Sequence, residues 1–391
     1  MSIIQDISPH MVYLALMSKP KKQNSEEKKR INRKQWIATA HEAIAAQRLQ
    51  IVQSKAPHKA FNDKEIFFVQ ECTYSNGDHV IVKVSAPDIR DRITLKKEAY
   101  WCRRIQQLVT EAKEKGITIP IHFPEVVDVF TYKEQAGIIT RYIIDDWVGF
   151  KGLSKEERED IIIKIIDSMQ NLPIPEEELV QPSDKRLIPV ITAEDYPKRA
   201  RQYLGELVAS KYITKFDKNK IVSLMEKNVA VINSFPLKLN HGDFHTGNFR
   251  YSKDPQTGDD IITLFDLELI TIQNSFSMVA AVANLFDLVA LANVHPGRDK
   301  YPEVFGGVPL FSTLFSVPQM IHRLEKRFVM NNKRRKDAEL VYRLMRIDDC
   351  YVRLADAVYE AQSSREELND VEVDSYREIL LQQLHHCLAK D

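Results

Sequence analysis

Residues 241–248 read HGDFHTGN, and residues 264–268 read LFDLE. The first segment places Asp243 five residues before Asn248, in a loop with two glycines. The second segment brings a carboxylate, Asp266, to the end of an apolar run. Phosphoryl transfer needs a carboxylate that accepts the proton of the acceptor hydroxyl, and oxygen ligands that hold Mg²⁺. We therefore assign the first role to Asp243 and the second to Asn248 and Asp266.

The chain between these two segments predicts a β-hairpin. Residues 249–251 and 261–264 flank the sequence PQTGDD at 255–260, which is rich in turn-forming residues. Antiparallel pairing of the two runs would fold Asp266 back beside Asn248. The hairpin would thus bring the two expected Mg²⁺ ligands together.

The motif His-Gly-Asp-x-x-x-x-Asn, followed by an apolar residue, Asp, x and Glu, resembles the aminoglycoside phosphotransferase and choline kinase superfamily. Its members are small-molecule kinases with a protein-kinase-like fold. The resemblance implies an α+β fold of two lobes, with a small antiparallel β N-lobe and a larger, mainly helical C-lobe. It implies that Asp243 is the catalytic base and that Asn248 and Asp266 hold Mg²⁺. It also gives Glu268 a role in binding a second metal ion or a cationic group of the substrate.

The same resemblance implies ATP as the phosphoryl donor, with GTP as the alternative. The acceptor would be a hydroxyl of a small molecule such as an amino-alcohol, an aminoglycoside or a sugar. Gly242 stands where protein kinases have the arginine of His-Arg-Asp, and Leu267-Glu268 replaces the Phe-Gly that follows their metal-binding aspartate. These two differences favour a small acceptor over a protein.

The sequence before residue 146 predicts a small antiparallel sheet. Segments 49–52, 66–74 and 80–84 are rich in β-branched and aromatic residues, and Asn76-Gly77 is a strong hairpin signal. Two more strands are expected at 123–130 and 137–144.

A helix should follow the third strand and carry Glu98, fifteen residues after Lys83. In kinase-like folds the strand lysine contacts the nucleotide phosphates and is held by a glutamate from this helix. The resemblance thus implies Lys83 and Glu98 as the nucleotide-binding pair, with the nucleobase on backbone groups of Tyr142 and Ile144. Residues 54–65 depart from the family pattern because they contain no glycine. The sequence therefore does not indicate which groups of this segment would bind the phosphates.

We divide the chain into an N-terminal extension (1–47, partly basic and partly helical), an N-lobe (48–146) and a C-lobe (147–391). The C-lobe should be mainly helical, with helices expected over 221–235, 318–330 and 337–362 among others.

Composition bounds the class of protein. The chain has 391 residues, 44% hydrophobic and 28% charged, with a formal net charge of zero. A zero balance argues against a nucleic-acid partner. The four cysteines show no CxxC spacing, which predicts free thiols in a reducing compartment. Apolar residues 11–17 are too few to span a bilayer, so we expect no integral membrane segment and a cytoplasmic location. The oligomeric state stays open.

Three alternatives remain for the loop 241–248. Its side chains could simply pin the loop. His241, Asp243 and His245 could instead bind a transition metal in a hydrolase. The third alternative is a kinase-fold protein that binds nucleotide or a partner without transfer activity, which the glycine-free segment 54–65 would favour.

The acceptor site is less clearly indicated. Asp348, Asp349 and Asp356 would either line it or form ordinary ion pairs with nearby arginines, and the second interpretation is favoured. An aromatic cage for a quaternary ammonium would draw on residues such as Trp147, Tyr342 and Tyr351.

Overall fold

The computed structural model describes residues 33–52, 67–85, 89–143, 146–181, 188–294, 314–363 and 370–389. The chain divides into two compact units. Unit 1 comprises Met1–Trp147, Asn171–Pro189 and Gly247–Ile270, whereas unit 2 comprises Val148–Gln170, Val190–Thr246 and Thr271–Asp391.

Unit 1 contains an antiparallel sheet of five strands in the order β1-β2-β3-β5-β4. The strands are β1 (Gln50–Ile51), β2 (Phe67–Thr73), β3 (His79–Ser85), β4 (Val126–Tyr132) and β5 (Gln135–Arg141). The predicted turn between β2 and β3 is confirmed: the Gly77 amide donates to the Tyr74 carbonyl at 2.9 Å. Gly77 has φ +88°, a conformation that glycine adopts without steric cost.

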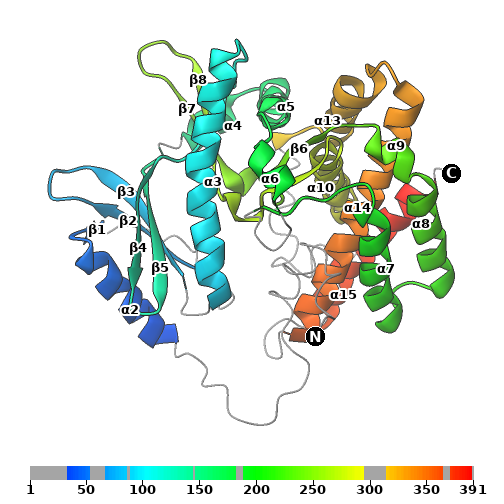
Figure 1. Cartoon of the computed structure of the whole chain (residues 1–391), viewed down its shortest axis with the longest axis horizontal. Coiled ribbons are helices and arrows are strands. Elements are labelled where there is room, and N and C mark those ends of the chain that lie inside the picture. The colour runs from blue at the N-terminus through cyan, green and yellow to red at the C-terminus, as the bar shows by residue number, and fades with distance from the viewer. Residues whose placement is uncertain are drawn as a thin grey trace, which may run out of the picture. The chain divides into compact units, whose positions relative to one another are not determined.

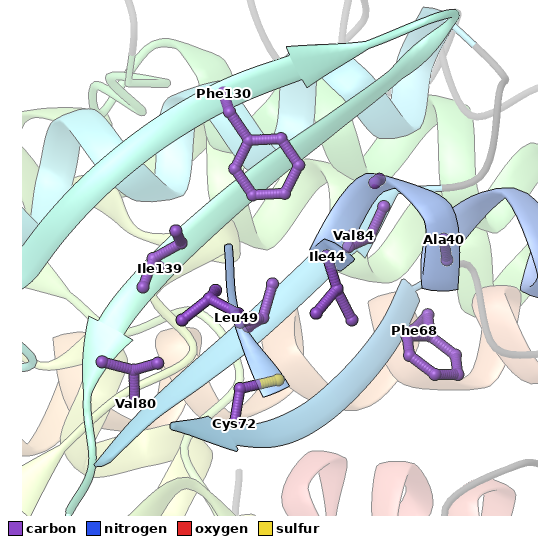
Figure 2. Packing of buried hydrophobic residues seen from close by; sticks show 11 residues of the cluster. Ala40, Ile44, Leu49, Phe68, Cys72, Val80, Val84, Phe130 and Ile139 are labelled. Carbon is purple, nitrogen blue, oxygen red and sulfur yellow. The ribbon is translucent and has the colours of Figure 1, made fainter. Parts of the chain in front are cut away.

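A helix covers each face of this sheet (Figure 1). α2 (Arg33–Ala46) packs on one face through Ala40, Ala43 and Ile44. Figure 2 shows Ala40 and Ile44 among side chains of β2 to β5. α3 (Ile89–Glu114) covers the other face. Successive strand residues point to opposite faces, so the valines of β3 at 80, 82 and 84 face α2. Lys83 therefore points toward α3.

Unit 1 also contains the predicted hairpin and two short helices. β7 (Phe249–Lys253) pairs antiparallel with β8 (Asp260–Leu264), which confirms the hairpin. At its tip the Asp254 carboxylate accepts the amides of Gln256 and Thr257 at 2.7 and 3.0 Å. A 3₁₀ turn, η2 (Leu267–Leu269), follows β8, and α6 (Glu176–Val180) comes from the segment 171–189.

Unit 2 is mainly helical, as predicted. α4 (Trp147–Gly152) carries the chain into it, and β6 (Leu237–Asn240) pairs antiparallel with β9 (Thr271–Asn274). Its further helices are α5 (Lys155–Asn171), α7 (Asp195–Ala209), α8 (Lys215–Lys227), α9 (Val229–Asn233), α10 (Ser277–Val294), α13 (Val317–Leu324), η4 (Glu325–Met330), α14 (Arg335–Ser363) and α15 (Asp370–Leu388). The long helix α14 buries Leu344, Ile347 and Leu354 at helical spacing, which makes it the centre of the core.

Two of the expected helices differ in the structure. The helix predicted over 221–235 is wrong as one element, because it breaks at Asn228 between α8 and α9. The Asn228 side chain donates to the Leu224 carbonyl at 2.7 Å, the competition with backbone bonding that disfavours asparagine within helices. The helix predicted over 318–330 is α-helical only to Leu324 and then becomes π-helical. None of the helices in the described ranges combines the length and apolar character that crossing a bilayer requires.

Candidate functional site

One lysine and three carboxylates form a buried cluster in unit 1. The Lys83 ammonium donates to Glu98 Oε2 at 2.8 Å, to Asp266 Oδ1 at 2.8 Å and to Glu268 Oε2 at 3.1 Å. The Lys83 side chain is 14% exposed, so these bonds are poorly screened by solvent. The structure thus brings together four of the residues singled out in the sequence.

The local fold explains why these groups meet. Lys83 faces α3 from β3, and Glu98 is on the part of α3 that packs against η2. Asp266 precedes η2 and adopts φ +64° and ψ +55°, a left-handed conformation uncommon for a residue other than glycine. Such conformations persist where surrounding contacts hold them and are frequent at functional sites.

The hairpin fixes Asn248 next to this segment. The ladder pairs Phe249 with Leu264, and beyond it the Phe265 amide donates to the Asn248 carbonyl at 3.0 Å. The residue before Asp266 is therefore bonded to Asn248, as the predicted hairpin requires. The Asn248 side chain is 5% exposed.

The ionisation of the cluster reflects its burial. Burial lowers the pKa of Lys83, but the carboxylates outweigh this effect and raise that pKa well above the usual value. Burial raises the pKa of Glu98, and Lys83 opposes the shift. Burial also raises the pKa of Glu268 to about 7, assisted by Asp266 and opposed by Lys83. Lys83 therefore stays charged and is shared among its acidic neighbours.

The cluster has the donor chemistry of a site for a hard divalent cation. One oxygen from each of Glu98, Asp266 and Glu268 lies within 4.8 Å of the other two, and this is the one such group in the described part of the chain. Carboxylate oxygens are the ligands that Mg²⁺ prefers. His241, Asp243 and His245 form no comparable group, so the structure gives the metal-hydrolase alternative no support.

Two further residues of this cluster were missed in the sequence. The Lys83 ammonium lies 4.4 Å from the ring centroid of Phe67, a cation–π distance. Phe67 is two positions along β2 from Val69, the partner of Lys83, so the strand register could have identified it. Lys97 precedes Glu98, and burial lowers the pKa of Lys97 to about 8, opposed by Glu268 and Glu178.

The loop that carries Asp243 belongs to unit 2. β6 ends at Asn240, whose side-chain oxygen accepts the Gly242 amide at 3.1 Å, and Gly242 has φ +83°. The Asp243 carboxylate is 46% exposed, with His245 Nε2 at 3.7 Å. His241 is fully buried and packs edge-on against Phe244, so it braces the loop. Asp243 is the accessible carboxylate of the motif.

Comparison with solved structures supports the same reading of the fold. No protein-family model matches the chain, and no curated protein matches it in sequence. The GDP complex of wild-type aminoglycoside 2'-phosphotransferase-IIIa matches with a TM-score of 0.53 and 9% identity, over 91% of this chain and 99% of that one. The GDP and kanamycin complex of APH(2")-IIia matches with a TM-score of 0.52 and 10% identity, over 89% and 99% of the two chains. The chain has the aminoglycoside phosphotransferase fold. This confirms the predicted α+β, protein-kinase-like fold.

Of the two residues predicted to contact the nucleobase, the structure describes Tyr142 and not Ile144. Tyr142 is 41% exposed, and its amide donates to the His79 carbonyl at 3.3 Å. Because the Tyr142 amide is already bonded, a backbone contact of Tyr142 with a nucleobase would have to use the Tyr142 carbonyl. Ile144 and the glycine-free segment 54–65 lie outside the described residues.

The acidic residues of α14 serve the packing of unit 2. Asp348 is buried, lies 3.3 Å from Arg199 of α7 and accepts the Tyr351 hydroxyl. Burial raises the pKa of Asp348, and Arg199 opposes the shift. Asp349 pairs with Arg353 at 2.9 Å. The favoured interpretation, ion pairing with an arginine of the same helix, therefore holds for Asp349, whereas Asp348 is buried and pairs with an arginine of another helix. Asp356 is exposed.

The aromatic cage has no support in the structure. Tyr351 is 0% exposed and bonded to Asp348, so it offers no face to a ligand. Tyr342 is buried on another part of α14, and the Trp147 side chain lies outside the described part of the structure.

Proposed function

We propose that this chain is a Mg²⁺-dependent phosphotransferase that moves the γ-phosphate of ATP or GTP to a hydroxyl of a small molecule. The observation that carries the proposal is the Lys83 ammonium, held by Glu98 of α3 and by both carboxylates of the Asp266 segment. The fold supports it, since both neighbours above were solved with GDP.

On this proposal Lys83 binds the nucleotide phosphates. Its ammonium has three acidic partners in the structure, and phosphate oxygens would replace one or more of them. Glu98 keeps the ammonium in place, because it comes from a helix that packs on the sheet. The Tyr142 carbonyl would accept a hydrogen bond from the nucleobase.

Asn248, Asp266 and Glu268 would hold Mg²⁺. Their oxygens are hard ligands, and the three carboxylates of the cluster carry more charge than Lys83 balances. Bound Mg²⁺ neutralises charge on the β- and γ-phosphate oxygens. Asp266 is bridged to Asn248 through the backbone bond of Phe265, which supports a shared ligand role.

Asp243 would orient the acceptor hydroxyl and take its proton. Its carboxylate is accessible, as a group that meets a substrate must be. Proton removal can come late in a loose transition state. Removing a preorganised electrostatic group of this kind costs about 3–4 kcal/mol of transition-state stabilisation, or roughly 100- to 1,000-fold in rate.

The test is transfer of labelled γ-phosphate from ATP and GTP, with Mg²⁺, to a panel of choline, ethanolamine, kanamycin, homoserine and sugars. Asp243→Asn should abolish transfer while leaving nucleotide binding intact. Asp259→Asn, in the exposed hairpin tip, is the matched control and should behave as wild type. Folded wild type that neither binds nucleotide nor moves phosphate would refute the proposal. Binding without transfer to any acceptor would favour the nucleotide-binding alternative.

A further inference from the structure

Unit 2 contains a cavity of about 450 Å³ between η4, α14 and α15. This volume is in the range of small-molecule sites, about 300–1,000 Å³. Its wall includes Val329 and Met330 of η4, Leu340 and Tyr342 of α14, and Cys387 of α15. No residue of the loop 241–248 lines it, so it is distinct from the part of unit 2 that carries Asp243.

The π-helical turn η4 shapes this cavity. In an α-helix, residues i and i+5 are about 140° apart around the helix axis. In a π turn the amide of residue i+5 bonds to the carbonyl of residue i, which brings these two residues to the same side. The Asn331 amide donates to the Lys326 carbonyl at 3.3 Å, which is such a bond. The π turn therefore lets Glu325, Val329 and Met330 line one cavity. π turns are rare and are frequently found at functional sites.

Two of the charged side chains along the wall, Arg346 and Glu339, have partners of opposite charge within the protein. The Arg346 guanidinium donates to Asn284 at 2.8 Å and to the Asp287 carboxylate. The Glu339 carboxylate accepts from Arg335 at 2.7 Å. Glu325 and Arg343 carry opposite charges and line the same cavity. The two glutamates and two arginines of the wall carry no net charge together, so we expect the ligand to be uncharged.

The wall also offers apolar surface and a buried hydroxyl group. Val329, Met330 and Leu340 supply aliphatic or thioether surface. Tyr342 is 5% exposed, and its hydroxyl has no hydrogen-bond partner among the described residues. An unsatisfied buried hydroxyl costs about 1–3 kcal/mol, which a hydrogen-bonding ligand would recover.

We propose that this cavity binds a small, uncharged, mainly apolar molecule that carries a hydroxyl or carbonyl group. The proposal does not depend on the phosphotransferase function. It gives unit 2 a ligand site of its own, which can be tested by measuring binding without any measurement of phosphate transfer.

The probe is 2-naphthol, compared with naphthalene, 2-naphthoate and 2-naphthylmethylammonium by ligand-observed NMR and calorimetry on the full chain. We expect saturable 1:1 binding of 2-naphthol and at least tenfold weaker binding of both charged analogues. Met330→Trp should fill the cavity and weaken 2-naphthol binding at least tenfold. Leu340→Trp, in the part of the wall that α14 supplies, gives the same test if Met330→Trp does not fold. The exposed Lys326→Trp, in the same turn but outside the wall, is the control.

Tyr342→Phe tests the hydroxyl separately. It should reduce the preference for 2-naphthol over naphthalene to about twofold. No saturable binding to folded wild type, or equal binding to both filled variants and wild type, would overturn the proposal. Preference for a charged analogue would overturn the assigned ligand class, and an unchanged preference in Tyr342→Phe would overturn the role of that hydroxyl.

Discussion

Replacing Lys83 with methionine tests the cluster directly. The change keeps most of the side-chain length and removes the ammonium that three carboxylates share. Breaking a buried ion pair by removing one partner costs about 3–5 kcal/mol. Two carboxylates at the 4.8 Å limit of the cluster repel by about 3.5 kcal/mol at an effective dielectric constant of about 20. Both values place the expected loss of unfolding free energy of unit 1 near 3–5 kcal/mol.

Tryptophan fluorescence measures this loss in the correct unit. All three tryptophans, Trp36, Trp101 and Trp147, belong to unit 1, and Trp101 is fully buried. Urea unfolding followed by fluorescence therefore reports unit 1 even if the two units unfold separately. The control is Lys113→Met, an exposed lysine in the last turn of α3, which should change stability by less than about 0.5 kcal/mol.

A second variant separates charge from packing. Glu98→Gln removes one of the three carboxylates, so adding it to Lys83→Met should cost less than the sum of the single changes. A loss below about 1 kcal/mol for Lys83→Met, or strictly additive losses in the double variant, would show that the ammonium does not hold the cluster together.

Three other predictions concern stability alone. Burial raises the pKa of Cys72 to about 12, whereas an unfolded thiol ionises at about pH 8.5. Between these values the folded state binds more protons than the unfolded state, so the free energy of unfolding falls as the pH rises. Cys72→Ala should remove about 1.4 kcal/mol per pH unit from that slope. Gly137→Ala would place its Cβ 2.0 Å from the Phe130 ring and should cost about 1–3 kcal/mol by fluorescence, and less when combined with Phe130→Leu. Thr214→Ala removes the capping bond to the Asp217 amide at 3.1 Å and should cost about 1 kcal/mol, seen as faster hydrogen exchange in the first turn of α8; unchanged exchange would contradict it.

Much of unit 1 could be predicted because its signals are local. Asn76-Gly77 identified the β2–β3 turn, and the run of β-branched residues at 80–84 assigned Lys83 to the third strand. The turn-rich tip between residues 249 and 264 was enough to predict the hairpin. These features depend on neighbouring residues, so a single sequence contains them.

The rest depends on contacts between distant residues. Glu268 is 185 residues from Lys83, and no local pattern shows that its carboxylate reaches that ammonium. The packing of α2 on the face of the sheet opposite α3 and the π turn after Leu324 likewise follow from tertiary contacts. The row of aspartates on α14 had two interpretations in the sequence, and only the position of Arg199 on another helix distinguishes them.

The charge balance of the cluster leads to a final prediction about Mg²⁺. Burial raises the pKa of Glu268 to about 7, so above that pH, with all groups ionised, three carboxylates and one ammonium sum to a charge of −2. These side chains are at most 31% exposed. A divalent cation would bring that sum to zero, so Mg²⁺ should stabilise unit 1 without any nucleotide. At a concentration ten times its dissociation constant the gain is about 1.4 kcal/mol. Fluorescence-detected urea unfolding at matched ionic strength should show the gain with MgCl₂ and not with NaCl, and Asp266→Asn should lose it. An equal gain in Asp266→Asn would mean that Mg²⁺ binds elsewhere, and the assignment of this cluster as its site would be wrong.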